Sequence, residues 1–205
     1  MRYKLVGIAA AVFLTLLCGR LQAQEVKSAI FAGGCFWCVE SDFDQIPGVV
    51  ETISGYTGGT APNPTYRQVT AGGTGHYEAV EIRYDPAQVS YETLLIAFWR
   101  SVDPTDPDGQ FCDRGDSYRT AIFVATDEER RLAESTRDVA EAVIGEPIVT
   151  PIVAAGPFFP AEDYHQDYYK KNPARYRYYR WACQRNQTVE EIWGEQAYQG
   201  IPEHG

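Results

Sequence analysis

The chain has 205 residues, of which 44% are hydrophobic and 22% are charged, a composition typical of globular proteins that argues against disordered and low-complexity architectures. This length suits a single domain. The formal net charge of −10 disfavours binding to nucleic acid, because an acidic chain repels a phosphate backbone.

The first residues have the layout of a secretory signal. Two basic residues precede an apolar run from Leu5 to Cys18, and Ala23 offers a small residue for cleavage. The run is shorter than the ~20 residues that a membrane-spanning helix needs. We therefore expect a signal peptide at 1–23, no stable membrane insertion after its removal, and a periplasmic or secreted protein. A lipoprotein anchored through Cys18 is the alternative.

Patterns of apolar residues predict strands and helices in the first half of the remaining chain. A buried strand at 28–32 leads into a double-glycine turn, and the apolar spacing that follows predicts a helix ending before Pro47. Two further strands are expected at 49–56 and 79–84, the second with its apolar residues on one face.

Capping residues mark the helices of the second half, which begin at Ser90 and Thr126. We expect helices at 90–99 and 126–144 and strands at 120–125 and 148–154. This mixture indicates an α+β fold, a two-layer mixed sheet with flanking helices and a ferredoxin-like core. The aromatic and basic stretch around 175–185 is expected to belong to an appendage.

Four cysteines remain once the signal is removed, Cys35, Cys38, Cys112 and Cys183. In an oxidising compartment they can form two structural disulfides, and three pairings are open. Cys35 can instead be a reactive thiol, because the first position of a helix offers unpaired N–H groups and the positive end of the helix dipole. Both favour a thiolate and lower a thiol pKa from its usual ~8.5. We therefore expect Cys35 to be an acidic, nucleophilic thiol.

The residues around this cysteine, GGCFWCVE at 33–40, closely resemble the signature of the A-type peptide methionine sulfoxide reductases. Further motifs similar to those of the family follow in its order, GYTGG at 55–59, PTYR at 64–67, GHYEAV at 75–80, YDP at 84–86, YRTAIF at 118–123 and AEDYHQ at 161–166. The resemblance implies a catalytic domain at 24–172 and a C-terminal tail at 173–205.

The resemblance implies reduction of the S epimer of methionine sulfoxide, free or within oxidised exported proteins, to methionine. Cys35 then attacks the electron-poor sulfur, and its oxygen must gain protons before it leaves. Glu78 matches the acid of the family, and a carboxyl group desolvated by aromatic neighbours has a raised pKa that lets it donate a proton near neutrality.

The resemblance also implies the residues that hold the substrate. Tyr66 and Tyr118 match the tyrosines whose hydroxyls hydrogen-bond the sulfoxide oxygen. Asp113 matches the aspartate that orients the site. Phe36 and Trp37 are expected to form the apolar pocket for the S-methyl group.

A sulfenic acid left on Cys35 must be resolved by a second thiol. Cys183 is the first choice, because tails like this one deliver a resolving cysteine in family members. Cys38 and Cys112 stand where many members have other residues, so either can join a relay, and Cys38 is one helical turn from Cys35, within reach of a CxxC disulfide.

We expect electrons from a thioredoxin-like protein, no bound cofactor or metal, and a monomer. A thiol-disulfide oxidoreductase is a rival, because Cys35 and Cys38 form a CxxC at a helix start. A second rival is a zinc-stabilised module that uses these two residues with Cys112 and His165 or His76. A noncatalytic, aromatic-rich binding domain is the third.

Overall fold

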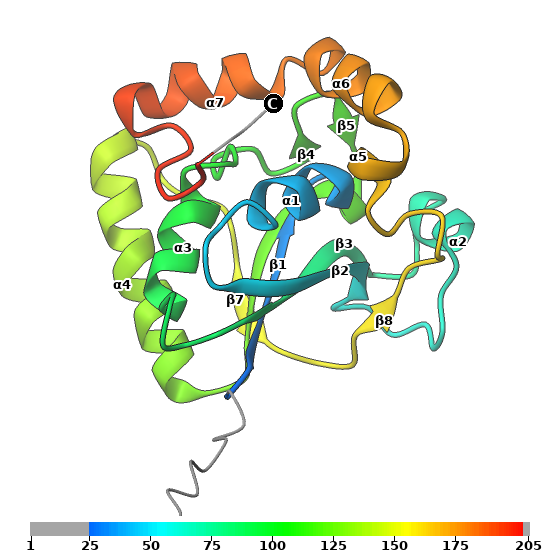
Figure 1. The fold of residues 1–205 in the computed structure, drawn as a ribbon, viewed down its shortest axis with the longest axis horizontal. Coiled ribbons are helices and arrows are strands. Elements are labelled where there is room, and N and C mark those ends of the chain that lie inside the picture. Colours follow the sequence, from blue (N-terminus) through cyan, green and yellow to red (C-terminus); the bar gives the residue numbers. More distant parts are fainter. Residues whose placement is uncertain (1–24, 203–205) are drawn as a thin grey trace, which may run out of the picture.

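The computed structural model describes residues 25–202, in which a six-stranded sheet carries most of the core (Figure 1). The strands are ordered β7-β6-β1-β3-β2-β8, and the β6–β7 pair is parallel while the other pairs are antiparallel. Their bounds are β1 Lys27–Gly33, β2 Val49–Thr57, β3 Tyr77–Tyr84, β6 Thr120–Val124, β7 Ile152–Ala154 and β8 Phe159–Pro160.

Three helices, α1 (Phe36–Phe43), α3 (Tyr91–Trp99) and α4 (Asp127–Ile144), close the main core against one face of the sheet. Their apolar side chains form one buried cluster with those of β1, β3 and β6. A smaller cluster around Phe123 lies apart from this core. The expected α+β fold, with a mixed sheet and flanking helices, is therefore confirmed.

Side-chain caps set the starts of the two helices that were expected to have them. The Ser90 hydroxyl accepts from the backbone N–H of Thr93 at 3.0 Å, and Thr126 caps α4 in the same way. Gly145 ends α4 in the left-handed conformation, with φ of 77°. Each cap satisfies backbone groups that a helix end leaves unpaired.

The shortest elements were not expected from the sequence. These are α2 (Tyr66–Thr70), the β4–β5 hairpin (Gly109–Gln110 with Asp113–Arg114), a 3-10 turn at Asp116–Tyr118, and β8. The sequence predicts a short helix at 163–169, and the structure has turns at 163–167 followed by α5 (Tyr168–Lys171). The strand expected at 148–154 is shorter and begins after Pro151, whose nitrogen has no hydrogen to donate to a ladder. Likewise α1 ends at Phe43, before the expected end near Pro47.

The C-terminal segment is packed against the core, which corrects the expectation of an appendage. It forms α6 (Pro173–Ala182) and α7 (Arg185–Trp193), which cross the top of the view in Figure 1. Val189 and Trp193 belong to the main core. The segment therefore contributes to the folded body as well as carrying Cys183.

The expected signal peptide at 1–23 lies outside the described residues. Within residues 25–202, no helix combines the length and the apolar character that crossing a membrane requires.

Candidate active site

Cys35 lies at the junction between β1 and α1, where it is the N-cap residue of the helix. Gly34 precedes it in the left-handed region, with φ of +83°, and a Cβ added there would lie 2.6 Å from the Cβ of Gln110. Only glycine fits this turn without strain or a shift of its neighbour. The expected position of Cys35 at a helix start is therefore confirmed.

Glu78 reaches this junction from β3, where its side chain is only 1% exposed. One carboxyl oxygen accepts a hydrogen bond of 3.2 Å from the backbone N–H of Phe36, the first residue of α1. The other oxygen, Oε1, has no hydrogen-bond partner among the described residues. A carboxyl group in this setting has one oxygen held in place and one free for a further contact.

The environment of Glu78 keeps it protonated at neutral pH. Burial raises its pKa to about 8, the negative charge of Asp113 adds to this, and the Phe36 N–H opposes it. Desolvation has this direction because it penalises the charged form of an acid. The side chain is therefore a proton donor at neutral pH.

Two tyrosines meet Glu78 from other parts of the fold. Tyr66 is the first residue of α2, and its backbone N–H donates to Glu162 at 3.0 Å. Tyr118 ends the 3-10 turn before β6. Burial and the neighbouring Glu78 raise the pKa of Tyr66 to about 12 and that of Tyr118 still further. Both hydroxyls thus keep their protons and remain hydrogen-bond donors.

The Cys35 thiol is buried and does not have the acidic character expected from its helix position. Burial raises its pKa well above the ordinary value, and Cys38, Glu78 and Asp113 add to the rise. The helix dipole favours a thiolate by a modest amount, whereas loss of water around a charged sulfur costs more. The expectation of an acidic Cys35 thiol is therefore wrong for this state.

The acidic member of the cysteine pair is Cys38, one turn along α1. Its interaction with Cys35 lowers its pKa to about 7 against the effect of burial, and the positive charges of Arg185 and Arg180 contribute in the same direction. Both cysteines are free, with Cys35 6% and Cys38 2% exposed. The positive charges of these arginines therefore favour the thiolate form of Cys38.

Sequence reasoning missed the two buried arginines near this pair. Arg180 pairs with Asp42 of α1 at 2.7 Å. Arg185 donates to the carbonyl oxygens of Gly33 at 3.1 Å and Ser101 at 2.9 Å. Each side chain is 2% exposed. A basic, aromatic segment ordinarily lies on the surface, which is why these contacts were not expected. The one signal in the sequence is that residues 168–186 contain no acidic residue, so Arg180 and Arg185 have no ion-pair partner close by in the sequence.

The two aromatic residues after Cys35 differ in position, because Phe36 lies in the core and Trp37 lines a groove. Phe36 is buried, with ring contacts to Tyr66 and His165. The Trp37 indole donates to Nδ1 of His165 at 3.0 Å and stacks on Tyr168 with ring centroids 3.7 Å apart. Trp37, Tyr66 and His165 line a groove of about 680 Å³. The structure thus brings an aromatic wall to the site and adds His165, which sequence reasoning considered only as a zinc ligand.

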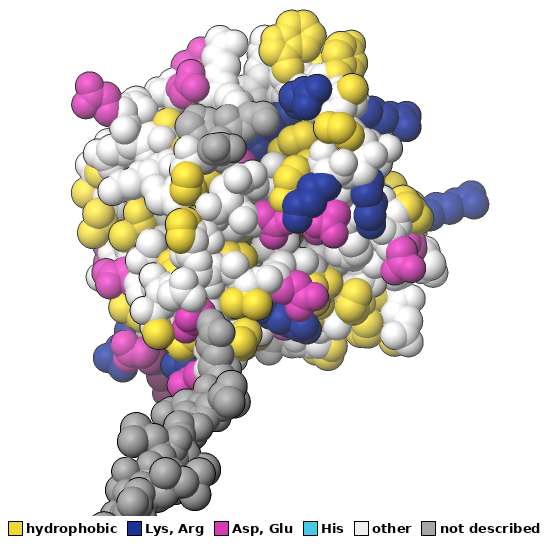
Figure 2. Space-filling view, in the orientation of Figure 1, with side chains coloured by type: hydrophobic (Ala, Val, Ile, Leu, Met, Phe, Trp, Pro, Cys, Tyr) yellow, Lys and Arg dark blue, Asp and Glu magenta, His cyan; other side chains and the backbone are white. Residues whose placement is uncertain are grey.

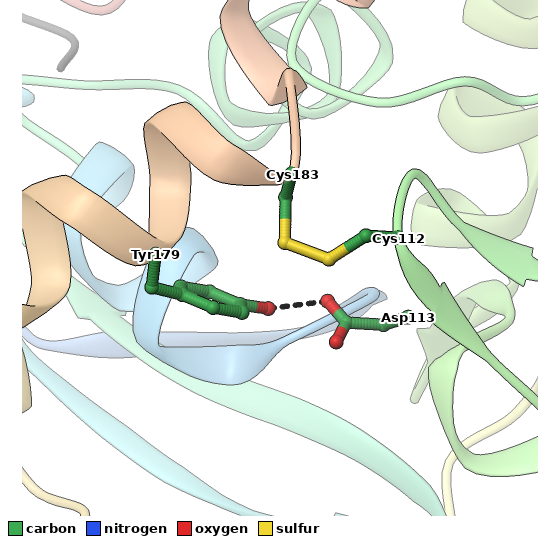
Figure 3. Close-up of a disulfide and its surroundings, with 4 residues drawn as sticks. All are labelled: Cys112, Asp113, Tyr179 and Cys183. Atoms are coloured by element: carbon green, nitrogen blue, oxygen red, sulfur yellow. Dashed lines mark hydrogen bonds between the residues drawn. A yellow bond between two sulfur atoms is a disulfide. The ribbon is translucent and has the colours of Figure 1, made fainter.

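A disulfide, which we call the distal disulfide, joins Cys112 to Cys183, and both cysteines line the same groove (Figure 3). Cys183 directly follows α6, and Cys112 precedes Asp113 in the β4–β5 hairpin. Figure 3 shows the Tyr179 hydroxyl of α6 donating to the Asp113 carboxylate. Asp113 therefore lies next to the distal disulfide in the chain, and its negative charge also raises the pKa of Cys35.

The zinc alternative does not fit the fold. Among the described residues, metal-capable side chains come within 4.8 Å of one another in a group of three at Cys112, Asp113 and Cys183, and the two cysteines there are bonded. His76 instead accepts from the N–H of Gly59 at 3.2 Å and contacts the carbonyl of Ala61 at 2.7 Å. These contacts give His76 a structural role in holding the 59–61 turn.

Comparisons with known proteins agree with one another. A family model described as peptide methionine sulfoxide reductase matches residues 27–197. Peptide methionine sulfoxide reductase MsrA 2 of Rhizobium meliloti is 53% identical over 197 residues, covering 96% of this chain and 97% of the relative.

Solved structures give the same result. Methionine sulfoxide reductase A of Corynebacterium diphtheriae superimposes with a TM-score of 0.66 and 37% identity, covering 75% of this chain and 78% of that one. Mxr1 from Saccharomyces cerevisiae, in complex with Trx2, shares the fold with a TM-score of 0.52 and 21% identity, covering 70% of this chain and 85% of that one.

Proposed function

Because the chain belongs to the A type of the peptide methionine sulfoxide reductases, enzymes that reduce methionine (S)-sulfoxide with thiols, we propose that Cys35 is its nucleophile and Glu78 its acid. The observation that carries this assignment is the protonated Glu78 carboxyl beside Cys35, with one oxygen lacking a partner among the described residues. A thiol-disulfide oxidoreductase with the same CxxC breaks no sulfur–oxygen bond, so its reaction needs no acid to protonate a leaving oxygen.

In the proposed first step, the Cys35 sulfur bonds to the sulfoxide sulfur while the sulfur–oxygen bond of the substrate breaks. Glu78 supplies a proton to the oxygen, and the hydroxyls of Tyr66 and Tyr118 stabilise the negative charge on it. The thiol proton of Cys35 also goes to this oxygen, which leaves as water. A water molecule then attacks the Cys35 sulfur, the sulfur–sulfur bond breaks to release methionine, and the proton that this water loses returns to Glu78. The products are methionine and a sulfenic acid on Cys35, so the sulfoxide is reduced by two electrons and the cysteine is oxidised by two.

We propose that Cys38 resolves the sulfenic acid, ahead of Cys183, which the sequence placed first. Cys38 is buried beside Cys35 and is the thiol of the pair with a pKa near 7. Its thiolate attacks the Cys35 sulfur, and the hydroxyl leaves as water. Cys183 is bonded to Cys112 in this structure, which supports a later role for it.

The distal pair then acts as the second stage of a relay. As a dithiol, Cys112 and Cys183 exchange with the Cys35–Cys38 disulfide and become oxidised themselves. The observed arrangement, with Cys35 and Cys38 free and Cys112 bonded to Cys183, matches the end of such a cycle. A thioredoxin-like protein is the proposed final reductant, which agrees with the Trx2 complex of the yeast relative.

Single replacements of the four cysteines by serine test these roles. We expect Cys35→Ser to abolish conversion of the S-sulfoxide with any thiol. Cys38→Ser should form one methionine per enzyme and accumulate a sulfenic acid that dimedone labels, whereas Cys183→Ser should stop at a Cys35–Cys38 disulfide. Turnover of the R epimer alone would contradict the assignment, and a trapped sulfenic acid in Cys183→Ser would restore Cys183 as the resolver.

We further propose that the protein works outside the cytoplasm as a monomer and repairs oxidised exported proteins. The signal-like layout of residues 1–23 supports export. N-terminal sequencing of protein from cell fractions and light scattering of the purified enzyme test these two points. An uncleaved N-terminus in the cytoplasmic fraction would contradict the first, and a dimer mass would contradict the second.

A further inference from the structure

One surface next to the distal disulfide combines positive charge with exposed aromatic rings. We propose that it is the docking site for an acidic protein dithiol that reduces the Cys112–Cys183 disulfide, an inference that rests on the proposed function. We call this surface the α6 face, and it consists of Lys171, Arg175, Arg177, Tyr178 and Trp181.

Charge is strongly segregated along the chain. Residues 168–186 contain six basic residues and no acidic one, so all 28 acidic residues lie elsewhere. Figure 2 shows several Lys and Arg side chains gathered over the region of α5 and α6. Arg175 and Arg177 are exposed and form no ion pair with any described residue. On a protein of net charge −10, such a patch attracts an acidic partner selectively.

The same surface exposes two large aromatic side chains. Tyr178 is 68% exposed and Trp181 is 74% exposed, the largest exposed fractions among the bulky hydrophobic residues of the described chain. Their ring centroids are 6.0 Å apart. Tyrosine, tryptophan and arginine are the residues that dominate binding energy at protein interfaces. The α6 face therefore has the composition of a protein-binding surface.

The position of the α6 face beside the Cys112–Cys183 disulfide indicates which kind of partner it binds. The α6 face adjoins Cys183, and Arg175 and Tyr178 line the groove that contains both cysteines of the distal disulfide. Cys112 is exposed, whereas Cys35 and Cys38 are 6% and 2% exposed. A protein bound at the α6 face reaches the distal disulfide without entering the buried site. This access suits a protein that delivers electrons.

The exchange balances in two steps. A donor thiolate attacks the exposed Cys112 sulfur, and the disulfide breaks with Cys183 leaving as a thiolate that takes up a proton. The second donor thiol then attacks the mixed disulfide and releases Cys112. The donor ends as a disulfide, and Cys112 and Cys183 end as thiols ready for the next cycle.

The test measures reduction of the Cys112–Cys183 disulfide directly, without any sulfoxide, by rapid acid quench and thiol labelling. The reductants are a thioredoxin-fold protein of net negative charge and dithiothreitol. We expect Arg177→Glu and Trp181→Ala each to slow reduction by the protein about tenfold and to leave the dithiothreitol rate unchanged. Salt should slow the wild type more than Arg177→Glu, because screening weakens an attraction that the variant lacks.

Matched controls on α4 are Arg131→Glu and Val139→Ala, which change an exposed charge and an exposed apolar side chain far from the disulfide. Both should keep the wild-type rate with the protein reductant. Equal slowing by the α6 and α4 variants would overturn the proposal, as would equal slowing with dithiothreitol. A raised KM for a sulfoxide peptide, with the protein-reductant rate unchanged, would assign the face to the substrate and overturn it as well.

Failure of the proposed function has a separate signature. In that case the wild-type disulfide is still reduced by the protein donor, but no methionine forms from the sulfoxide. The rate of reduction of the Cys112–Cys183 disulfide by the protein donor therefore tests the docking proposal independently of the proposed function.

Discussion

Replacing Glu78 by glutamine tests whether a buried, protonated carboxyl group drives the reaction. Glutamine keeps the size of the side chain and can accept from the Phe36 N–H through its amide oxygen, but it has no acidic proton. Loss of a general acid lowers rates about 10²- to 10⁴-fold. We expect Glu78→Gln to show such a loss in single-turnover formation of methionine. The wild-type rate should fall as pH rises above about 8, because the carboxyl group then ionises.

The same substitution has an effect on stability whose sign follows from the raised pKa. Between pH about 4.5 and about 8, the unfolded chain releases the Glu78 proton while the folded protein keeps it. The free energy of unfolding of the wild type therefore falls as pH rises through this window and levels off above it. The full difference is at most roughly 5 kcal/mol, from 1.36 kcal/mol per pKa unit. Glu78→Gln lacks this dependence and should gain stability over the wild type with rising pH.

Urea denaturation at pH 5, 6.5 and 8.5 measures this difference. Glu40→Gln is the matched control, because Glu40 is also buried and its pKa is raised to about 7 by burial. It should show a smaller gain in stability and keep full activity. A stability difference between Glu78→Gln and wild type that does not change with pH would refute the protonated carboxyl group, as would an active Glu78→Gln enzyme.

The remaining predictions concern the backbone that holds Cys35. Gly34→Ala should lower both stability and kcat, because alanine at φ of +83° costs about 1–2 kcal/mol and its Cβ meets Gln110. The control is Gly145→Ala, at φ of +77° with open space around it, which should lose stability without losing kcat. Equal kcat values in the two variants would contradict the argument. Arg185→Met should destabilise the protein by about 3–5 kcal/mol in urea and raise the pH midpoint for alkylation of Cys38, because the Gly33 and Ser101 carbonyls lose their partner and the thiolate loses a positive charge. Arg185→Lys should keep much of the Cys38 midpoint but not the stability, and an unchanged midpoint in Arg185→Met would exclude the electrostatic role.

The parts of the fold that local chemistry determines were predictable from the sequence. Alternating apolar residues located β3, and serine and threonine caps located α3 and α4. The double-glycine turn placed Cys35 at a helix start because few other residues adopt its backbone conformation. The gathering of Glu78 beside Cys35 followed from the resemblance to the family, since no local pattern joins a strand residue to a distant helix.

What escaped prediction depends on long-range contacts. The pKa of Cys35 is governed by burial, which its neighbours in sequence do not reveal. The Cys112–Cys183 bond was one of three pairings, and sequence gave no reason to choose it. Arg180 and Arg185 looked like surface residues until Asp42 and two carbonyl oxygens supplied partners for them in the core. Such partners lie 84 or more residues away in the sequence.

These two arginines determine how far the cysteine between them can travel. Arg180 is fixed three positions before Cys183 and Arg185 two positions after it, each held in the interior. Only the four residues 181–184, which are the end of α6 and the two residues after it, are left to move the sulfur between its bonding partners. Disulfide exchange at Cys183 thus requires a local movement of residues 181–184 and no displacement of the whole C-terminal segment. The rest of the fold can keep its conformation through each cycle of oxidation and reduction.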